Sequence, residues 1–91
     1  MKITYEMVNG IDELRRIARL VHRLDEADCN SDFNPRRNKK RDKLLQAAAK
    51  IAAEEFDAVI YHHGDPRGCG LYLCDKENAN NQSYTHEIAL F

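Results

Sequence analysis

The chain begins with an alternation of apolar and polar residues over positions 2–8. A period of two is typical of a half-buried strand, so we expect a short strand here. Asn9 and Gly10 interrupt the alternation. We expect Asn9 to cap a following helix, because asparagine accepts hydrogen bonds from the first amides of a helix.

Two long segments then carry apolar residues at intervals of three and four, the period of a helix with one buried side. The first runs from about Gly10 to Asp28. Its apolar positions are Ile11, Leu14, Ile17, Ala18, Val21 and Leu24. The second runs from Pro35 to about Phe56, with Asn34 as the N-cap and proline in the first turn, where its missing N–H is not needed. Its apolar positions are Leu44, Leu45, Ala48, Ile51, Ala52 and Phe56. The short polar connection predicts that the two helices pack antiparallel.

The period changes back to two after the second helix. Ala58–His62 and Gly70–Cys74 are rich in strand-forming residues. Between them lies a tight-turn motif that consists of Gly64, Asp65, Pro66 and Gly68. A polar, asparagine-rich stretch follows, and Tyr84–Phe91 is the last predicted strand.

These elements predict an α+β fold in which an antiparallel helix hairpin packs on a small antiparallel β-sheet, in the order β-α-α-β-β-β. The 91 residues are enough for one core, so residues 1–91 are expected to form a single domain. The last three strands should form a meander around the turn motif, and the position of the first strand in the sheet stays open.

The three cysteines are an odd number, and neither a signal-peptide pattern nor an apolar stretch of membrane length is present. We therefore expect reduced thiols and a cytoplasmic location, in a host cell if the chain is viral.

Charge is unevenly distributed along the chain. Residues 35–50 have a net charge of +6, whereas the whole chain has a net charge of −1. Six bases fill the first turns of the second helix: Arg36, Arg37, Lys39, Lys40, Arg41 and Lys43. The helix dipole disfavours bases there. Either they serve an acidic or phosphate-bearing partner, or they are neutralised locally by Asp25, Glu26, Asp28 and Asp32.

The turn motif accounts for its aspartate, proline and glycines, but a turn does not require Arg67. An exposed arginine on a rigid hairpin is a good contact residue, so Arg67 joins the six bases as a candidate partner-binding residue.

Histidines and cysteines gather in the C-terminal half, at His62, His63, Cys69, Cys74 and His86. Their spacing matches no zinc template, so we expect no metal and no cofactor. General acid–base catalysis by His62 or His63 would suit a small nuclease, but neighbouring strand residues point to opposite faces. We expect no enzyme, and a small histidine-dependent nuclease is the last alternative.

The segment from Tyr61 to Leu73 reads Tyr-His-His-Gly-Asp-Pro-Arg-Gly-Cys-Gly-Leu-Tyr-Leu. It resembles a signature of an orphan family of small proteins encoded by phages, prophages and plasmids, in which glutamine is usual at position 63 and alanine at position 70. The resemblance extends more weakly over roughly residues 22–91. It implies a genetic context, in which small accessory proteins bind and redirect host machinery such as CRISPR and restriction systems, and it implies no mechanism.

The leading hypothesis is thus a non-enzymatic phage or mobile-element accessory protein that binds a host protein or complex, for example as an anti-CRISPR or anti-restriction protein. The alternative is a nucleic-acid-binding protein that uses the same basic helix on a phosphate backbone.

Overall fold

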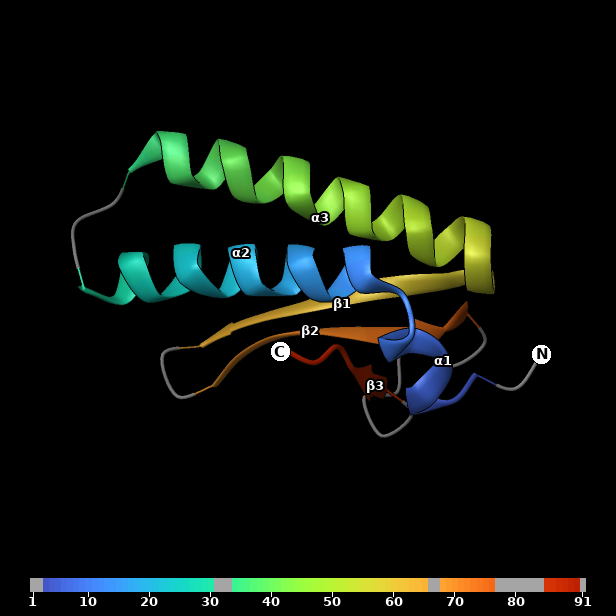
Figure 1. Cartoon of the computed structure of the whole chain (residues 1–91). Coiled ribbons are helices and arrows are strands. Elements are labelled where there is room, and N and C mark those ends of the chain that lie inside the picture. The colour runs from blue at the N-terminus through green and yellow to red at the C-terminus, as the bar shows by residue number, and fades with distance from the viewer. Residues whose placement is uncertain (1–2, 31–33, 66–67, 77–84, 91) are drawn as a thin grey trace.

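The computed structural model describes residues 3–30, 34–65, 68–76 and 85–90, and gives the backbone alone for residues 64, 65, 68, 69 and 85. Along these residues the elements are α1 (Tyr5–Asn9), α2 (Asp12–Asn30), α3 (Pro35–Phe56), β1 (Ala58–Asp65), β2 (Gly68–Asp75) and β3 (Thr85–Glu87) (Figure 1).

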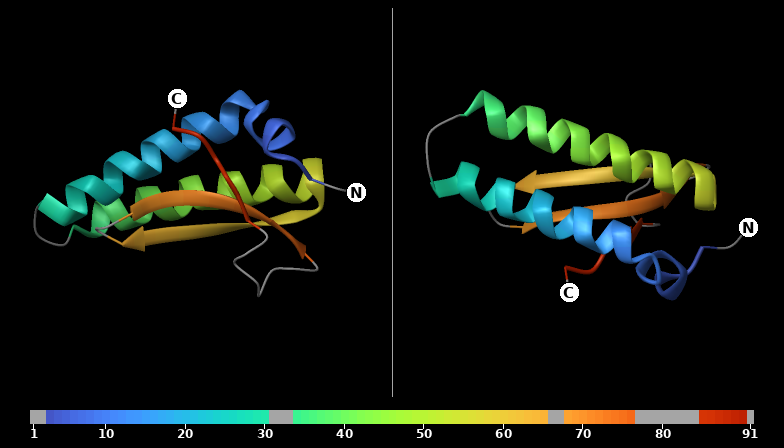
Figure 2. Two further views of the ribbon diagram at one scale, coloured as in Figure 1. Left: turned by 90° about the horizontal axis from the view of Figure 1, so that it is seen from below. Right: turned by 45° about the horizontal axis from the view of Figure 1, so that its top comes forward.

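The two long helices lie antiparallel and cover one face of a three-stranded antiparallel sheet, in which the strand order is β1-β2-β3 (Figures 1 and 2). The predicted α+β class, the helix hairpin and the meander of the last three strands are therefore confirmed. In Figure 1 the first turns of α3 and the end of β1 lie at the same end of the molecule.

Helix α3 has the bounds that its terminal signals predict. The Asn34 side chain accepts a hydrogen bond from the Arg36 amide at 2.9 Å, and Pro35 opens the first turn. At the other end Asp57 has φ 49° and ψ 47°, the left-handed conformation that stops a helix, and its N–H bonds back to Ala52 and Ala53. This single residue turns the chain directly into β1.

The hairpin of β1 and β2 extends to the predicted turn. Asp65 lies opposite Gly68, and Gly64 lies opposite Cys69. Pro66, like Arg67, lies outside the described residues, so the side-chain part of the turn prediction stays a prediction.

The core lies between the helices and the sheet. Fully buried side chains come from α2 (Leu14, Ile17, Ala18, Val21), from α3 (Ala48, Ala52) and from β2 (Leu71, Leu73). The alanines of α3 carry little bulk, so α2 and α3 can approach closely. Burial of each large aliphatic side chain stabilises the fold by roughly 1.5–3 kcal/mol.

The prediction of an N-terminal strand over residues 2–8 is wrong, because residues 5–9 form α1. The Thr4 hydroxyl accepts a hydrogen bond from the Met7 amide at 3.2 Å, and the Thr4 carbonyl accepts one from Val8. Thr4 is thus an N-cap, a role that the alternation of apolar residues concealed. On the side of the chain that an alternating strand would bury, Ile3 is buried, but Tyr5 and Met7 are exposed.

The predicted role of Asn9 as the N-cap of the next helix is also wrong. Asn9 ends α1, and its side chain bonds to the C-terminal segment. The side-chain amide donates to the Glu87 carbonyl at 2.9 Å, and the side-chain carbonyl accepts from the Ala89 amide at 2.6 Å. The Asn9 side chain therefore joins the end of α1 to the C-terminal segment, as backbone hydrogen bonds between two paired strands would do.

The last strand is shorter than the predicted Tyr84–Phe91. Regular pairing covers Thr85–Glu87, and Ile88 then continues beside β2 through one backbone bond of 2.9 Å to the Leu71 carbonyl. Ile88 and Ala89 are buried, so the C-terminal segment contributes to the core beyond the strand. Tyr84 and Phe91 lie outside the described residues.

We expect Asn9→Ala to destabilise the fold by about 1–3 kcal/mol, because it leaves the Ala89 amide and the Glu87 carbonyl without their partner. Urea unfolding checks this. Asn30→Ala is the matched control, since the Asn30 side chain donates to the Glu26 carbonyl of its own helix at an exposed position, and it should change stability by less than about 0.5 kcal/mol. Equal effects of the two substitutions would contradict the role of Asn9.

Candidate functional site

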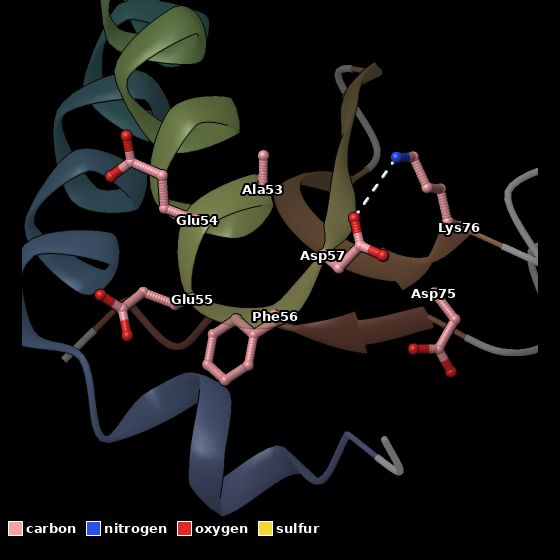
Figure 3. Close-up of a pocket in the computed structure, with 7 residues that line it drawn as sticks. All are labelled: Ala53, Glu54, Glu55, Phe56, Asp57, Asp75 and Lys76. Carbon is pink, nitrogen blue, oxygen red and sulfur yellow. Dashed lines mark hydrogen bonds and ion pairs between the residues drawn. The ribbon is translucent and has the colours of Figure 1, made fainter.

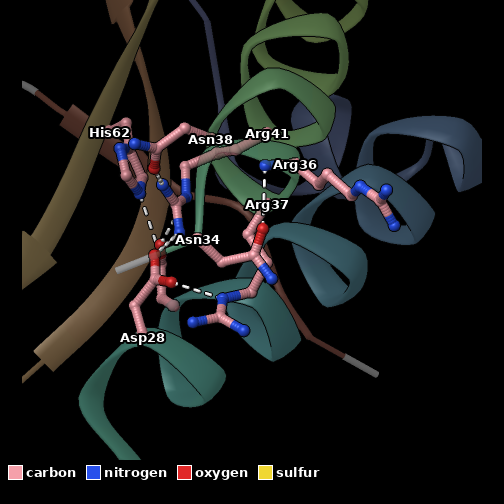
Figure 4. A network of polar contacts seen from close by, with 8 residues as sticks. Asp28, Asn34, Arg36, Arg37, Asn38, Arg41 and His62 are labelled. Atoms are coloured by element: carbon pink, nitrogen blue, oxygen red, sulfur yellow. Dashed lines mark hydrogen bonds and ion pairs between the residues drawn. The ribbon is translucent and has the colours of Figure 1, made fainter. Parts of the chain in front are cut away.

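The basic block of α3 divides into two sets that face different ways. Arg37 and Arg41, one helical turn apart, point at α2. The Arg37 Nε donates to Asp28 Oδ1 at 2.6 Å, and the Arg41 guanidinium bonds to the other oxygen of the same carboxylate. In Figure 4 Arg37 and Arg41 converge on Asp28, whereas the Arg36 side chain points away from it.

A second carboxylate, that of Asp25, is almost entirely buried, with 6% of its side chain exposed. Its Oδ1 lies 2.9 Å from the Arg41 Nε, and its Oδ2 lies 2.9 Å from the His62 Nε2. The Arg41 Nε–H is not aligned for a hydrogen bond with this oxygen, so the contact is an ion pair. Asp25 thereby joins α2 to α3 and to β1.

The network leaves little freedom to Arg41, whose side chain is 12% exposed. Besides the two carboxylates, its Nη1 donates to the Asn38 side chain at 2.7 Å. An arginine presents its donors in a rigid planar fork. Here that fork donates hydrogen bonds to Asn38 and Asp28 and forms an ion pair with Asp25.

The pKa of the Asp28 carboxyl is lowered from its ordinary value. The hydrogen bond from Arg37 is the largest cause, and the hydrogen bond from Arg41 is the next. Asp28 therefore stays ionised to a lower pH than an ordinary aspartate does, and its ion pairs between the two helices persist to that lower pH.

The other four bases of the block face solvent. Arg36, Lys39, Lys40 and Lys43 are all exposed, and together they line a shallow hollow of about 230 Å³. No carboxylate of the described residues lies within ion-pair distance of any of them. We call these four residues the outward row.

Lys50 continues the outward row, although the sequence pattern did not single it out. Positions 36, 40, 43, 47 and 50 follow each other at intervals of four and three, which places them on one side of a helix. Lys50 and Ala47 are both exposed. Arg36 and Lys50 are thus separated by about 21 Å along the helix axis.

The opposite end of α3 is acidic. Glu54, Glu55, Asp57 and Asp75 lie around a hollow of about 450 Å³, where Lys76 contacts Asp57 at 3.3 Å (Figure 3). Helix α3 has no acid in its first turn and no base in its last, so its charges oppose the helix dipole at both ends.

Local neutralisation of the basic block, one of the two interpretations of the sequence, is thus correct for Arg37 and Arg41. Asp25 and Asp28 supply the negative charge. Glu26 instead contacts His22 at 2.7 Å, and Asp32 lies outside the described residues.

A buried aspartate that orients a histidine also occurs in general-base pairs. Here the same carboxylate is shared with Arg41, and His62 lines neither of the two hollows. His63 is exposed, and the side chain of Cys69 is not described. Burial, reinforced by Asp75, raises the pKa of the Cys74 thiol, so it is held in its unreactive protonated form.

Sequence analysis named Asp25 as a possible neutraliser of the basic block, but it missed the burial of Asp25 and its contact with His62. A signal for Asp25 was present, because position 25 continues the buried stripe of Leu14, Ala18 and Val21 at helical spacing. A charged residue on such a stripe requires a buried partner.

In the described part of the chain no group of three or more His, Cys, Asp or Glu side chains is placed to hold a metal ion. Across the same residues, every helix is too short or too polar to cross a membrane. Searches for similarity found no matching protein-family model, no matching curated protein and no matching solved structure.

We expect Arg41→Gln to destabilise the fold by about 3–5 kcal/mol, because it leaves the buried Asp25 carboxylate without its cationic partner. The same substitution at exposed position 36 is the control. Arg36→Gln should be neutral or stabilising by a few tenths of a kcal/mol, since it removes a base from the first turn. Thermal and urea unfolding of both variants measure the change in stability. Similar losses of stability in the two variants would contradict a special role for Arg41.

A second expectation concerns pH. An aspartate in an unfolded chain has a pKa of about 3.9. Because the folded-state pKa of Asp28 is lowered, its contribution to stability is fully present above the unfolded value and is lost as the pH falls through the folded value. Wild type should therefore be more stable than Asp28→Asn at pH 7, and the difference should shrink steadily below about pH 4.

Urea unfolding between pH 7 and pH 2.5 measures this difference. In an Arg37→Gln background the same substitution should have a smaller pH-dependent effect, because the largest cause of the lowered pKa is gone. An equal effect in both backgrounds would assign the pH dependence to other groups.

Proposed function

We propose that this chain is a small accessory protein of a phage or another mobile element, which acts without catalysis by binding an acidic surface of a host protein. Its contact surface is the outward row of α3. The observation that carries the proposal is that the outward row has no carboxylate partner among the described residues, although Arg37 and Arg41 of the same block are neutralised.

The energetics of the helix support a role for these four charges. They lie within about 11 Å along the axis, so they repel one another, and Arg36 also opposes the helix dipole. Nothing in the packing of the core requires them, because their side chains are exposed. An acidic partner would offset both unfavourable terms.

Several features favour a protein over a nucleic acid as the partner. The outward row contains no aromatic side chain on which a base could stack. Asp42 lies beside it, and the acidic end of the same helix would repel a phosphate backbone that ran along α3. Ala47 has a small side chain between the long side chains of Lys43 and Lys50, so a side chain of a folded partner would fit between the two lysines.

A nucleic-acid backbone is the second candidate function, favoured by the length that Lys50 adds to the outward row. The two candidates differ in salt dependence. Neutralisation of phosphates releases counterions, so affinity for a duplex should fall by about one power of salt concentration for each phosphate contacted.

Arg67 was predicted as part of the contact surface, and it lies outside the described residues. The ends of β1 and β2 that flank it lie at the same end of the molecule as the first turns of α3 (Figure 1). Arg67 therefore stays a predicted member of the contact surface, because the strand ends on either side of it in the sequence lie near the first turns of α3. The resemblance to mobile-element proteins favours a host-defence complex, such as a CRISPR or restriction system, as the class of partner.

The test is affinity capture from a bacterial lysate, followed by a binding titration with the purified captured protein. Lys40→Glu/Lys43→Glu should lower the affinity at least about tenfold, because like charges across an interface are strongly unfavourable. The control Arg19→Glu/Arg23→Glu changes the net charge equally on α2 and should leave the affinity within about twofold of wild type. Equal losses in both variants, or capture of nucleic acid alone, would overturn the proposal.

A further inference from the structure

The outer side of β1 is a free edge of the sheet. The strand order is β1-β2-β3, and within the described residues no strand pairs with the other side of β1. Edge strands present unpaired backbone N–H and C=O groups, to which another extended chain can bond.

One backbone bond fixes which groups of β1 point outward. The Leu71 carbonyl accepts from the Ile88 amide, so it points at the C-terminal segment and away from β1. Leu71 lies opposite His62, which makes this a non-hydrogen-bonded pair of the β1–β2 ladder. The backbone groups of His62 therefore point to the free edge, and those of Ile60 and Ala58 do the same, because the direction alternates along a strand.

This edge lacks the features that usually block pairing. From Ala58 to Gly64 the strand contains no lysine, no arginine and no proline, and its only formal charge is Asp65 at the end. Apolar contacts are available on both faces of the strand, since Ile60 is half-buried on the helix side and Tyr61 is 37% exposed on the other. An added strand would find backbone bonds and side-chain contacts together.

Two bases of the outward row, Lys39 and Lys43, lie on the side of the molecule where β1 has its free edge. Arg37 and Arg41 point at α2, and Lys39 and Lys43 follow them by two residues, which turns them by about 200° around the helix. Lys39 and Lys43 are therefore on the flank of α3 that faces away from α2. Helix α3 packs on β1 and α2 packs on β2, so this flank is on the side of the free edge.

We propose that an extended, acidic segment of the partner adds to β1 as a fourth strand. Its backbone bonds to Ile60 and His62, and its acidic side chains lie toward Lys39 and Lys43. The inference rests on the proposed function in one respect, namely that the added strand belongs to the acidic partner.

The test uses amide hydrogen exchange, measured by NMR on the full chain. Two eight-residue peptides with blocked ends serve as probes, one of alternating valine and glutamate and one of alternating valine and threonine. In the free protein the amides of Ile60 and His62 should exchange faster than those of Tyr61 and His63, which bond to β2. With the acidic peptide at ten times its dissociation constant, exchange at Ile60 and His62 should slow about tenfold, because only the unbound fraction exchanges.

The acidic peptide should bind more tightly than the neutral one, and Lys39→Glu/Lys43→Glu should remove that preference without changing the exchange pattern of the free protein. Binding of the acidic peptide with no slowing at Ile60 and His62 overturns strand addition and leaves the proposed function standing. Equal slowing by both peptides at equal affinity supports strand addition and counts against an acidic partner.

Failure of both peptides to bind at millimolar concentration overturns the inference. Slow exchange at Ile60 and His62 in the free protein that speeds up on dilution also overturns it, since the edge would then be occupied by a second copy of the chain.

Discussion

The carboxylate of Asp25 is the point at which α2, α3 and β1 meet, and the relative placement of the three elements depends on it. One oxygen contacts Arg41 and the other contacts His62. Removing a carboxylate from water costs several kcal/mol unless its partners are well placed. Neither α3 nor β1 can therefore slide along α2 without leaving a buried charge unpaired.

Such an interaction contributes more to the choice of one arrangement than to overall stability. The two fully buried side chains of α3 are alanines, Ala48 and Ala52, and small side chains of similar shape discriminate poorly between neighbouring packings. Asp25 and Asp28 discriminate among these packings, because they bond only when Arg37 and Arg41 face α2. We infer that the polar network sets the rotation of α3 about its own axis.

That rotation has a consequence for the surface. With Arg37 and Arg41 turned inward, the outward row and Lys50 are necessarily turned outward, since the two sets alternate along one helix. The charges of α3 oppose its dipole at both ends, so tertiary packing has to hold the helix against its own electrostatics. The same packing that stabilises the fold thus leaves the cationic surface of α3 exposed.

Much of the candidate site could be predicted, and the part that could not has a physical cause. The basic block was evident from charge alone. Of its two interpretations, local neutralisation is correct for Arg37 and Arg41, and a partner for the outward row stays a proposal. Whether a base is neutralised depends on whether it lies on the side of α3 that faces α2. The sequence period does not show which side that is, because the first turns of α3 are polar on every side. At the N-terminus, alternation over seven residues fits a strand as well as it fits a capped turn, and the Thr4 hydroxyl decided in favour of the turn.

The elements with local signals could be derived from residue order alone: the start of α3 from Asn34 and Pro35, the two amphipathic helices from their period, and the hairpin from its turn residues. These features depend on residues a few positions apart, whose interactions exist before the chain folds. The partners of Asp25 and Asn9 are evident only in the folded chain, because His62 lies 37 positions from Asp25 and Ala89 lies 80 positions from Asn9. Contacts over such separations carry no local pattern, since any polar residue that the fold brings within reach can satisfy them.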